Sequence, residues 1–169
     1  MASATRSIET KGLVSTRNGY AACHFGLSRP IMHTVPHRIL VADDNHDTAD
    51  LTADLLRRDG HEVRTVYDGR QALETARTFH PHLVILDIQM PVMDGCAAAC
   101  ALRAESPHAN VVMVAYTALT QPADLDRVRR AGFDRYLSKP SAPGALEALV
   151  TNCLVRLRSR ERSFTSVTA

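Results

Sequence analysis

The chain has 169 residues, enough for one folded domain with extensions, and 45% of them are hydrophobic, as is usual for a globular protein. No apolar run reaches the roughly 18 residues of a membrane span and no signal-peptide pattern is present, so we expect a cytoplasmic protein without a membrane partner. The net charge of +2 is uneven, because residues 37–140 are acidic on balance while residues 1–36 and 141–169 are basic.

Residues 1–36 mix Ser, Thr, Arg, Gly and Ala without a helical or strand period, so we predict a disordered tail. Two explanations of residues 1–31 stay open. Either they form a basic arm that recruits an acidic partner, or translation starts at Met32. We favour the start at Met32, because the first predicted strand begins only a few residues later.

The first two predicted elements after the tail are a strand and a helix. Residues 38–42 form a short apolar run that leads into Asp43-Asp44, which is typical of a buried strand. A helix then begins at Asp47, with alanines and leucines at helical spacing, and ends at Asp59-Gly60.

The next elements bring a third acidic residue to the end of a strand. Residues 62–66 alternate in polarity and predict an edge strand, and Asp68-Gly69 begins a helix that runs to Phe79. Residues 83–86 are four apolar residues between turn signals, which indicates a strand buried on both faces. This strand leads directly into Asp87.

The C-terminal third continues the alternation of strands and helices. We predict helices over residues 95–104 and 123–130 and strands over residues 111–115 and 134–137. The last helix carries an apolar stripe and closes the domain near residue 158; the stripe consists of Leu146, Leu149, Val150, Cys153, Leu154 and Leu157. We therefore expect one domain over residues 37–158, followed by a disordered tail over residues 159–169.

The four cysteines match no zinc-binding or CxxC spacing. Cys96 and Cys100 are four residues apart and share one helix face. We predict small buried side chains in a reducing compartment for Cys23, Cys96, Cys100 and Cys153.

Alternating strands and helices predict an α/β fold, with a parallel sheet covered by helices on both faces. The carboxyl ends of parallel strands meet at one edge, so the residues that follow the strands should converge there. These residues are Asp43, Asp44, Asp87, Thr117 and Lys139. Each simpler interpretation, such as helix capping by Asp43, Asp44 and Asp94, a solvated Lys139 or a strand-end Thr117, explains one residue at a time.

Three carboxylates in one crevice need a cation, because each pair repels by about 4 kcal/mol at ~4 Å and an effective dielectric constant of ~20. An all-oxygen ligand set favours Mg²⁺. A metal ion, the ammonium of Lys139 and the hydroxyl of Thr117 together suit a transferring phosphoryl group. Asp87 then serves as the nucleophile that forms an aspartyl phosphate.

The set Asp43-Asp44, Asp87, Met90-Pro91-x-Met93-Asp94-Gly95, Thr117 and Lys139-Pro140 resembles the receiver domain of two-component response regulators. The spacings agree, since Thr117 follows Asp87 by 30 residues and Lys139 follows Thr117 by 22. The resemblance implies a flavodoxin-like, doubly wound, five-stranded parallel sheet of order 2-1-3-4-5 with five helices. It also implies a histidine kinase or histidine phosphotransfer protein as phosphoryl donor, and a downstream protein target that the sequence does not identify.

The resemblance assigns roles to particular residues. It implies that Asp87 accepts the phosphoryl group, that Asp44 binds Mg²⁺ directly and Asp43 through water, and that the backbone carbonyl of Gln89 is a further metal contact. It also implies that Lys139 contacts the phosphoryl group and that Thr117 moves onto it.

The resemblance extends to residues behind the site. Tyr136 takes the aromatic switch position and turns inward behind Thr117. The bond between Lys139 and Pro140 is expected to be cis. One departure is Tyr116, an aromatic residue at a position that is more often small or aliphatic.

Two other classes of function compete with this interpretation of the sequence. A haloacid-dehalogenase-type phosphatase also uses an aspartate nucleophile, but it needs a second Asp two residues later, where this chain has Gln89. A DNA-binding regulator needs a helix-turn-helix domain, and about 11 residues after the last predicted helix are too few for one. We therefore expect a signalling module whose only chemistry is Mg²⁺-dependent self-phosphorylation and autodephosphorylation, and not an enzyme.

Overall fold

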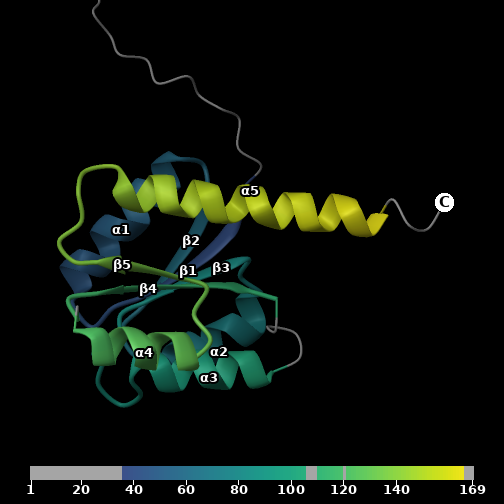
Figure 1. Ribbon diagram of the computed structural model, residues 1–169. Helices are drawn as coiled ribbons and strands as arrows, with labels where there is room; N and C mark the ends of the chain where they lie inside the picture. The colour runs from purple at the N-terminus through teal and green to yellow at the C-terminus, as the bar shows by residue number, and fades with distance from the viewer. Residues whose placement is uncertain (1–35, 106–109, 120, 166–169) are drawn as a thin grey trace, which may run out of the picture. The chain divides into compact units, whose positions relative to one another are not determined.

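The computed structural model describes residues 36–105, 110–119 and 121–165, and their side chains as far as residue 157. Within these ranges five strands alternate with five helices (Figure 1). The strands are β1 (Arg38–Ala42), β2 (Glu62–Val66), β3 (Leu83–Leu86), β4 (Val112–Thr117) and β5 (Arg135–Ser138). The helices are α1 (His46–Arg58), α2 (Gly69–Phe79), α3 (Gly95–Ala104), α4 (Pro122–Arg130) and α5 (Ala145–Thr165). The tail predicted over residues 1–36 lies, except for Pro36, outside the described residues.

All five strands are parallel and follow the order β2-β1-β3-β4-β5. This is the order that the sequence implied, and β2 is an edge strand, as its alternating polarity predicted. The central strand β3 is buried along its whole length between β1 and β4. The α/β fold and its sheet topology are therefore confirmed.

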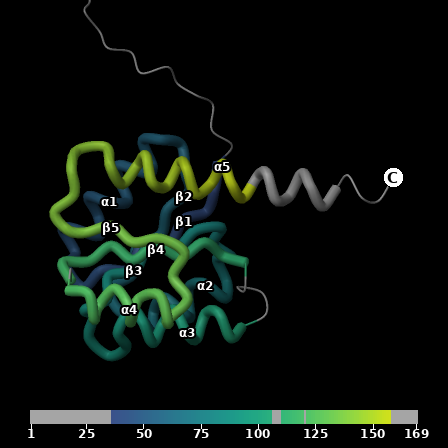
Figure 2. The backbone as a smooth tube through the Cα atoms, viewed as in Figure 1, coloured from purple at the N-terminus to yellow at the C-terminus, as the bar shows by residue number. Residues whose placement is uncertain are grey.

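The helices form two layers, one on each face of the sheet. Figures 1 and 2 show α1 and α5 on one side and α2, α3 and α4 on the other. Alternate residues of β1 supply the two cores, because successive strand side chains point to opposite faces: Ile39 and Val41 pack with α1 and α5, whereas Leu40 and Ala42 pack with α2 and α3.

Three helices begin at polar residues whose side chains accept a backbone hydrogen bond. Asn45 caps α1, Asp68 caps α2 and Asp94 caps α3, with oxygen–nitrogen distances of 3.0, 2.8 and 2.9 Å. The capping role considered for Asp94 is thus correct. Asp43 and Asp44 do not cap α1, because Asn45 takes that position and leaves both carboxylates at the sheet edge.

Helix α5 continues to Thr165, past the end expected near residue 158, so residues 159–165 of the predicted C-terminal tail are helical. The apolar stripe ends at Leu157, but residues 158–165 contain no Gly or Pro that would stop a helix. None of the helices in the described ranges combines the length and apolar character needed to cross a membrane.

The cysteines follow the prediction in part. Cys96 and Cys153 are buried, Cys100 is exposed, and Cys23 lies outside the described residues. Cys100 is the correction: α3 turns its buried side toward the core through Cys96, Ala99 and Leu102, while position 100 faces α4 at the surface, 3.8 Å from the carbonyl oxygen of Ala131.

Candidate functional site

The carboxyl ends of the strands bring the predicted residues to one edge of the sheet. Ala42 pairs with Leu86, so Asp43 and Asp87, the next residues along β1 and β3, lie at the same level, and Lys139 follows the end of β5 at the same edge. There one carboxylate oxygen from each of Asp43, Asp44 and Asp87 lies within 4.8 Å of the other two. Asp43 is buried, whereas Asp44 is exposed to solvent at the mouth of the site.

Lys139 connects two of these carboxylates. Its Nζ donates to Oδ2 of Asp43 at 2.5 Å and to Oδ2 of Asp87 at 2.9 Å, across 96 and 52 residues of sequence. Its backbone N–H donates to the carbonyl oxygen of Thr117, which ties β5 to β4 at the site. The Lys139–Pro140 bond is cis, as the resemblance implied.

Burial and charge act against each other at this cluster. Burial raises the pKa of Asp43 above its usual value, and the hydrogen bond from Lys139 opposes that shift without cancelling it. Burial alone would lower the pKa of Lys139, but its bonds to Asp43 and Asp87 outweigh this and raise the pKa. Lys139 therefore carries its positive charge at neutral pH and partly neutralises the acidic cluster.

The side chain of Asp87 is held in one orientation by the loop that follows it. Its Oδ1 accepts hydrogen bonds from the backbone N–H groups of Ile88 at 2.6 Å and Gln89 at 3.3 Å, while Oδ2 faces Lys139. Gly95 closes the same loop, because its N–H donates to the carbonyl oxygen of Ile88 at 3.0 Å. A carboxylate fixed by such contacts is prepared for attack on a positioned electrophile.

The donor set fits a hard divalent cation. Three carboxylates within 4.8 Å supply oxygen ligands, and no His or Cys belongs to this group within the described residues. Mg²⁺ binds through a small number of carboxylates and keeps several waters, and the exposed Asp44 leaves such waters access to solvent. The contact predicted for the backbone carbonyl of Gln89 stays a prediction.

Thr117 and Tyr136 are linked through one residue of the loop after β4. Thr117 is fully buried, and its Oγ1 accepts a hydrogen bond from the backbone N–H of Leu119 at 3.4 Å. The hydroxyl of Tyr136 donates to the carbonyl oxygen of Leu119 at 2.5 Å. The backbone N–H of Leu119 is therefore bonded to Thr117 and its carbonyl oxygen to Tyr136, the two residues for which the sequence predicts a change of position on phosphorylation.

Tyr116 lies on the other face of β4 from Thr117, with the α1 and α5 layer. Its hydroxyl is 3.2 Å from Oγ of Ser141, and the Nζ of Lys139 lies 5.2 Å from its ring centroid, within the range of a cation–π contact. The sequence marked Tyr116 as a departure from the family but did not reveal this contact with Lys139.

A second contact near the site was not predicted. The rings of His46 and Tyr67 are stacked, with centroids 3.6 Å apart and planes 7° from parallel. His46 is the first residue of α1 and Tyr67 follows β2, so the pair joins the beginning of α1 to the loop after β2, on the side of the sheet where Asp43 and Asp44 lie. No spacing rule would have found it, because the two residues belong to separate elements and are 21 residues apart in the sequence.

Comparison with known proteins gives a consistent result. The family model for the response regulator receiver domain matches residues 39–151. The DNA-binding response regulator MtrA of Mycolicibacterium smegmatis is 37% identical over 130 residues, which are 77% of this chain and 54% of MtrA. The polar-differentiation response regulator DivK of Brucella ovis is 31% identical over 112 residues, which are 66% of this chain and 91% of DivK.

A solved structure shares the fold as well. The receiver domain of the sensor histidine kinase PA1611 from Pseudomonas aeruginosa, which has a magnesium ion coordinated in its active site cleft, superposes with a TM-score of 0.65. It is 29% identical, and the match covers 70% of this chain and 97% of that domain. The chain spans about half the length of the MtrA relatives that it matches.

Proposed function

Because the chain belongs to the response regulator receiver domain family, we propose that it accepts a phosphoryl group on Asp87 and passes the signal on through a changed protein surface. The observation that carries this proposal is the pair of hydrogen bonds from Lys139 to Asp43 and Asp87. These bonds hold the ammonium group of Lys139 against the carboxylate of Asp87, which supports a role for Lys139 in contacting a phosphoryl group on Asp87.

The proposed reaction is a transfer between two side chains. A carboxylate oxygen of Asp87 attacks the phosphorus of a phosphohistidine on a histidine kinase or a histidine phosphotransfer protein. A P–O bond forms on Asp87, the P–N bond breaks, and the imidazole leaves. Lys139 then releases its bond to Asp87 and contacts the phosphoryl oxygens.

Asp43, Asp44, Asp87 and the backbone carbonyl of Gln89 would hold Mg²⁺ during this reaction. When bound, Mg²⁺ supplies positive charge that neutralises the phosphoryl oxygens and the carboxylate cluster. Among solved receiver domains, that of PA1611 carries magnesium in its active site cleft, which supports the same choice of ion here.

The output is a change around Thr117 and Tyr136. A phosphoryl group on Asp87 would attract the hydroxyl of Thr117, which now accepts from Leu119. Loss of that contact frees the loop whose carbonyl Tyr136 holds, so the surface formed by β5 and α4 changes for a downstream protein partner. Such a module acts in the cytoplasm as a signalling protein and turns over no substrate of its own.

DNA binding is not part of this proposal. It belongs to the name of the MtrA relatives, and the match covers only 54% of that protein. The properties proposed here are those of the matched receiver part.

Intact-mass measurement with phosphoramidate, a small donor with a P–N bond, tests the proposal. We expect one added phosphoryl mass in the presence of Mg²⁺ and none after its removal. Asp87→Asn should abolish the addition, whereas Asp94→Asn should retain it, because Asp94 caps α3 and lies outside the carboxylate cluster. Labelling without Mg²⁺, or equal labelling of Asp87→Asn, would reject the proposal.

A further inference from the structure

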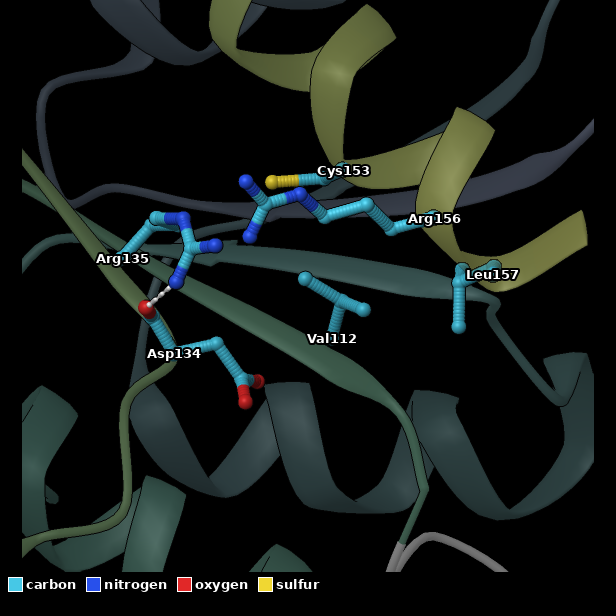
Figure 3. A pocket seen from close by; sticks show the side chains of 6 residues that line it. All are labelled: Val112, Asp134, Arg135, Cys153, Arg156 and Leu157. Atoms are coloured by element: carbon cyan, nitrogen blue, oxygen red, sulfur yellow. Dashed lines mark hydrogen bonds between the residues drawn. The ribbon is translucent and has the colours of Figure 1, made fainter. Parts of the chain in front are cut away.

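A second site, a small pocket lined by charged and apolar side chains, lies at the other end of the sheet from the acidic site. It has a volume of about 130 Å³ and lies between the beginnings of β4 and β5 and the middle of α5 (Figure 3). Its lining residues are Val112, Asp134, Arg135, Cys153, Arg156 and Leu157. Val112 and Arg135 are the first residues of their strands, whereas Thr117 and Lys139 lie at the opposite ends, so this pocket is separate from the phosphorylation site.

Two guanidinium groups face this pocket from different elements. Figure 3 shows Arg135 of β5 and Arg156 of α5 extending toward one another across it. Both charges also act on the thiol of Cys153 in its wall, whose pKa is raised by burial while each arginine opposes that shift. The pocket therefore places two exposed, positively charged side chains beside the apolar side chains of Val112 and Leu157 and the neutral thiol of Cys153.

Neither guanidinium has a carboxylate partner among the residues whose side chains are described. Nη1 of Arg135 donates to the backbone carbonyl oxygen of Asp134 at 2.6 Å, which leaves its charge uncompensated. Arg156 likewise forms no ion pair with any carboxylate whose side chain is described.

The one carboxylate in the lining is engaged elsewhere. Oδ2 of Asp134 accepts hydrogen bonds from Nη2 of Arg103 at 2.5 Å and from the backbone N–H of Met113 at 2.8 Å. Figure 3 shows this carboxylate turned away from the guanidinium groups of Arg135 and Arg156. Its charge is thus compensated by Arg103, and it does not occupy the space between the other two arginines.

We propose that this pocket binds a small phosphate-type oxyanion, with Arg135 and Arg156 as its ligands. Two guanidinium groups match the charge of a dianion, and their planar donors fit phosphate oxygens in pairs. A volume of about 130 Å³ is large enough to admit a small anion. Drug-sized ligands need about 300 Å³ or more. Free orthophosphate and the phosphate of a small monoester share this chemistry.

Amide NMR of the full chain in Mg²⁺-free buffer tests the proposal. Sodium phosphate is titrated at constant ionic strength against sodium chloride, while the amides of Met113, Arg135 and Cys153 report on the pocket. We expect saturable shifts at these three amides with phosphate and none with chloride. A parallel titration with methyl phosphate identifies the source: saturation by both anions assigns a site that accepts monoesters, and saturation by orthophosphate alone assigns the free ion.

Matched variants make the assignment specific. Arg135→Gln and Arg156→Gln should each weaken phosphate binding at least ten-fold while the dispersion of the spectrum stays that of the wild type. Arg70→Gln should bind normally, because Arg70 is an exposed arginine on α2, outside the pocket. Shifts that never saturate, that survive both pocket substitutions, or that occur only near Asp87 and Thr117 would overturn the proposal. This outcome is independent of whether Asp87 accepts a phosphoryl group.

Discussion

Gly95 lies directly against the backbone of Asp87. A Cβ atom at position 95 would be 2.0 Å from the carbonyl oxygen of Asp87 and 3.0 Å from the Cα of Ile88. The beginning of α3 can therefore fold back on the loop after β3 only if residue 95 has no side chain. Gly95 belongs to the motif on which the family resemblance rests, and the structure gives it a steric reason.

Gly95→Ala should consequently destabilise the protein. The clash is with backbone atoms that cannot rotate away, so we expect a loss of about 1–3 kcal/mol in the free energy of unfolding. Gly144→Ala is the control, because Gly144 has a φ of +78° but no atom within 4 Å of the added Cβ. That change should cost only about 1 kcal/mol. Urea unfolding of both variants measures the difference, and a smaller loss for Gly95→Ala than for Gly144→Ala would contradict it.

Asp43→Asn should change how stability depends on pH. Burial raises the pKa of Asp43 in the folded protein above the value of 3.8 that it has in the unfolded chain. The protonated carboxyl group therefore contributes its full stabilisation at a pH below 3.8, and this stabilisation is lost as the pH rises through the pKa of the folded protein. Asn resembles the protonated form and cannot lose a proton. Without Mg²⁺, the variant should therefore gain stability relative to the wild type as pH rises from 4 to 7.

Urea unfolding across this pH range tests that expectation, with Asp50→Asn, an exposed acid on α1, as the control. Addition of Mg²⁺ should make the wild type more stable than Asp43→Asn, because the bound ion stabilises the wild type and the variant has lost one acidic group of the metal site. A variant that becomes relatively less stable as pH rises would show that the bond to Lys139 outweighs the burial of Asp43.

Thr117→Ala should separate phosphorylation from its output. The hydroxyl is not the nucleophile, so Asp87 should still bind beryllofluoride, a phosphoryl mimic. The backbone N–H of Leu119 loses its hydrogen bond to Thr117, so Leu119 no longer connects Tyr136 to residue 117. We expect beryllofluoride to shift the amides of Leu119 and Tyr136 much less in the variant than in the wild type. Equal shifts in the two proteins would reject the coupling.

Tyr136→Phe is the complementary change. It removes the hydrogen bond from the Tyr136 hydroxyl to the carbonyl oxygen of Leu119 and leaves the ring in place. We expect a loss of about 1 kcal/mol in stability, typical of one hydrogen bond. Beryllofluoride should still shift the amide of Thr117, because that residue lies closer to the phosphoryl group. If the amide of Leu119 responds as in the wild type, Tyr136 has no part in the switch.

The parts of the fold that depend on local sequence agree with prediction. The bounds of β1, β2 and β3 follow from short apolar or alternating runs between turn residues. Strand β4 instead extends to Thr117, past the predicted end at residue 115, because Tyr116 and Thr117 pair with Leu137 and Ser138 of β5. A strand's end depends on its neighbour, and the periodicity of one segment does not reveal it.

In the candidate site, too, some contacts could be predicted from the sequence and others could not. That Lys139 would meet Asp43 and Asp87 could be predicted, since all three follow parallel strands. The stack of His46 on Tyr67 and the contact of Tyr116 with Lys139 could not, because both depend on side-chain directions. The two arginines of the second pocket come from β5 and α5, and no linear pattern relates them.

The proposal that Asp87 accepts the phosphoryl group can be tested chemically. Borohydride reduces an aspartyl phosphate to homoserine, so peptide mass spectrometry after reduction reports the phosphorylated position. Following incubation with Mg²⁺ and acetyl phosphate, we expect homoserine at position 87 and unchanged aspartate at positions 43 and 44. Homoserine at position 43 or 44 of the wild-type protein, or none at position 87, would contradict the assignment of Asp87 as the phosphoacceptor.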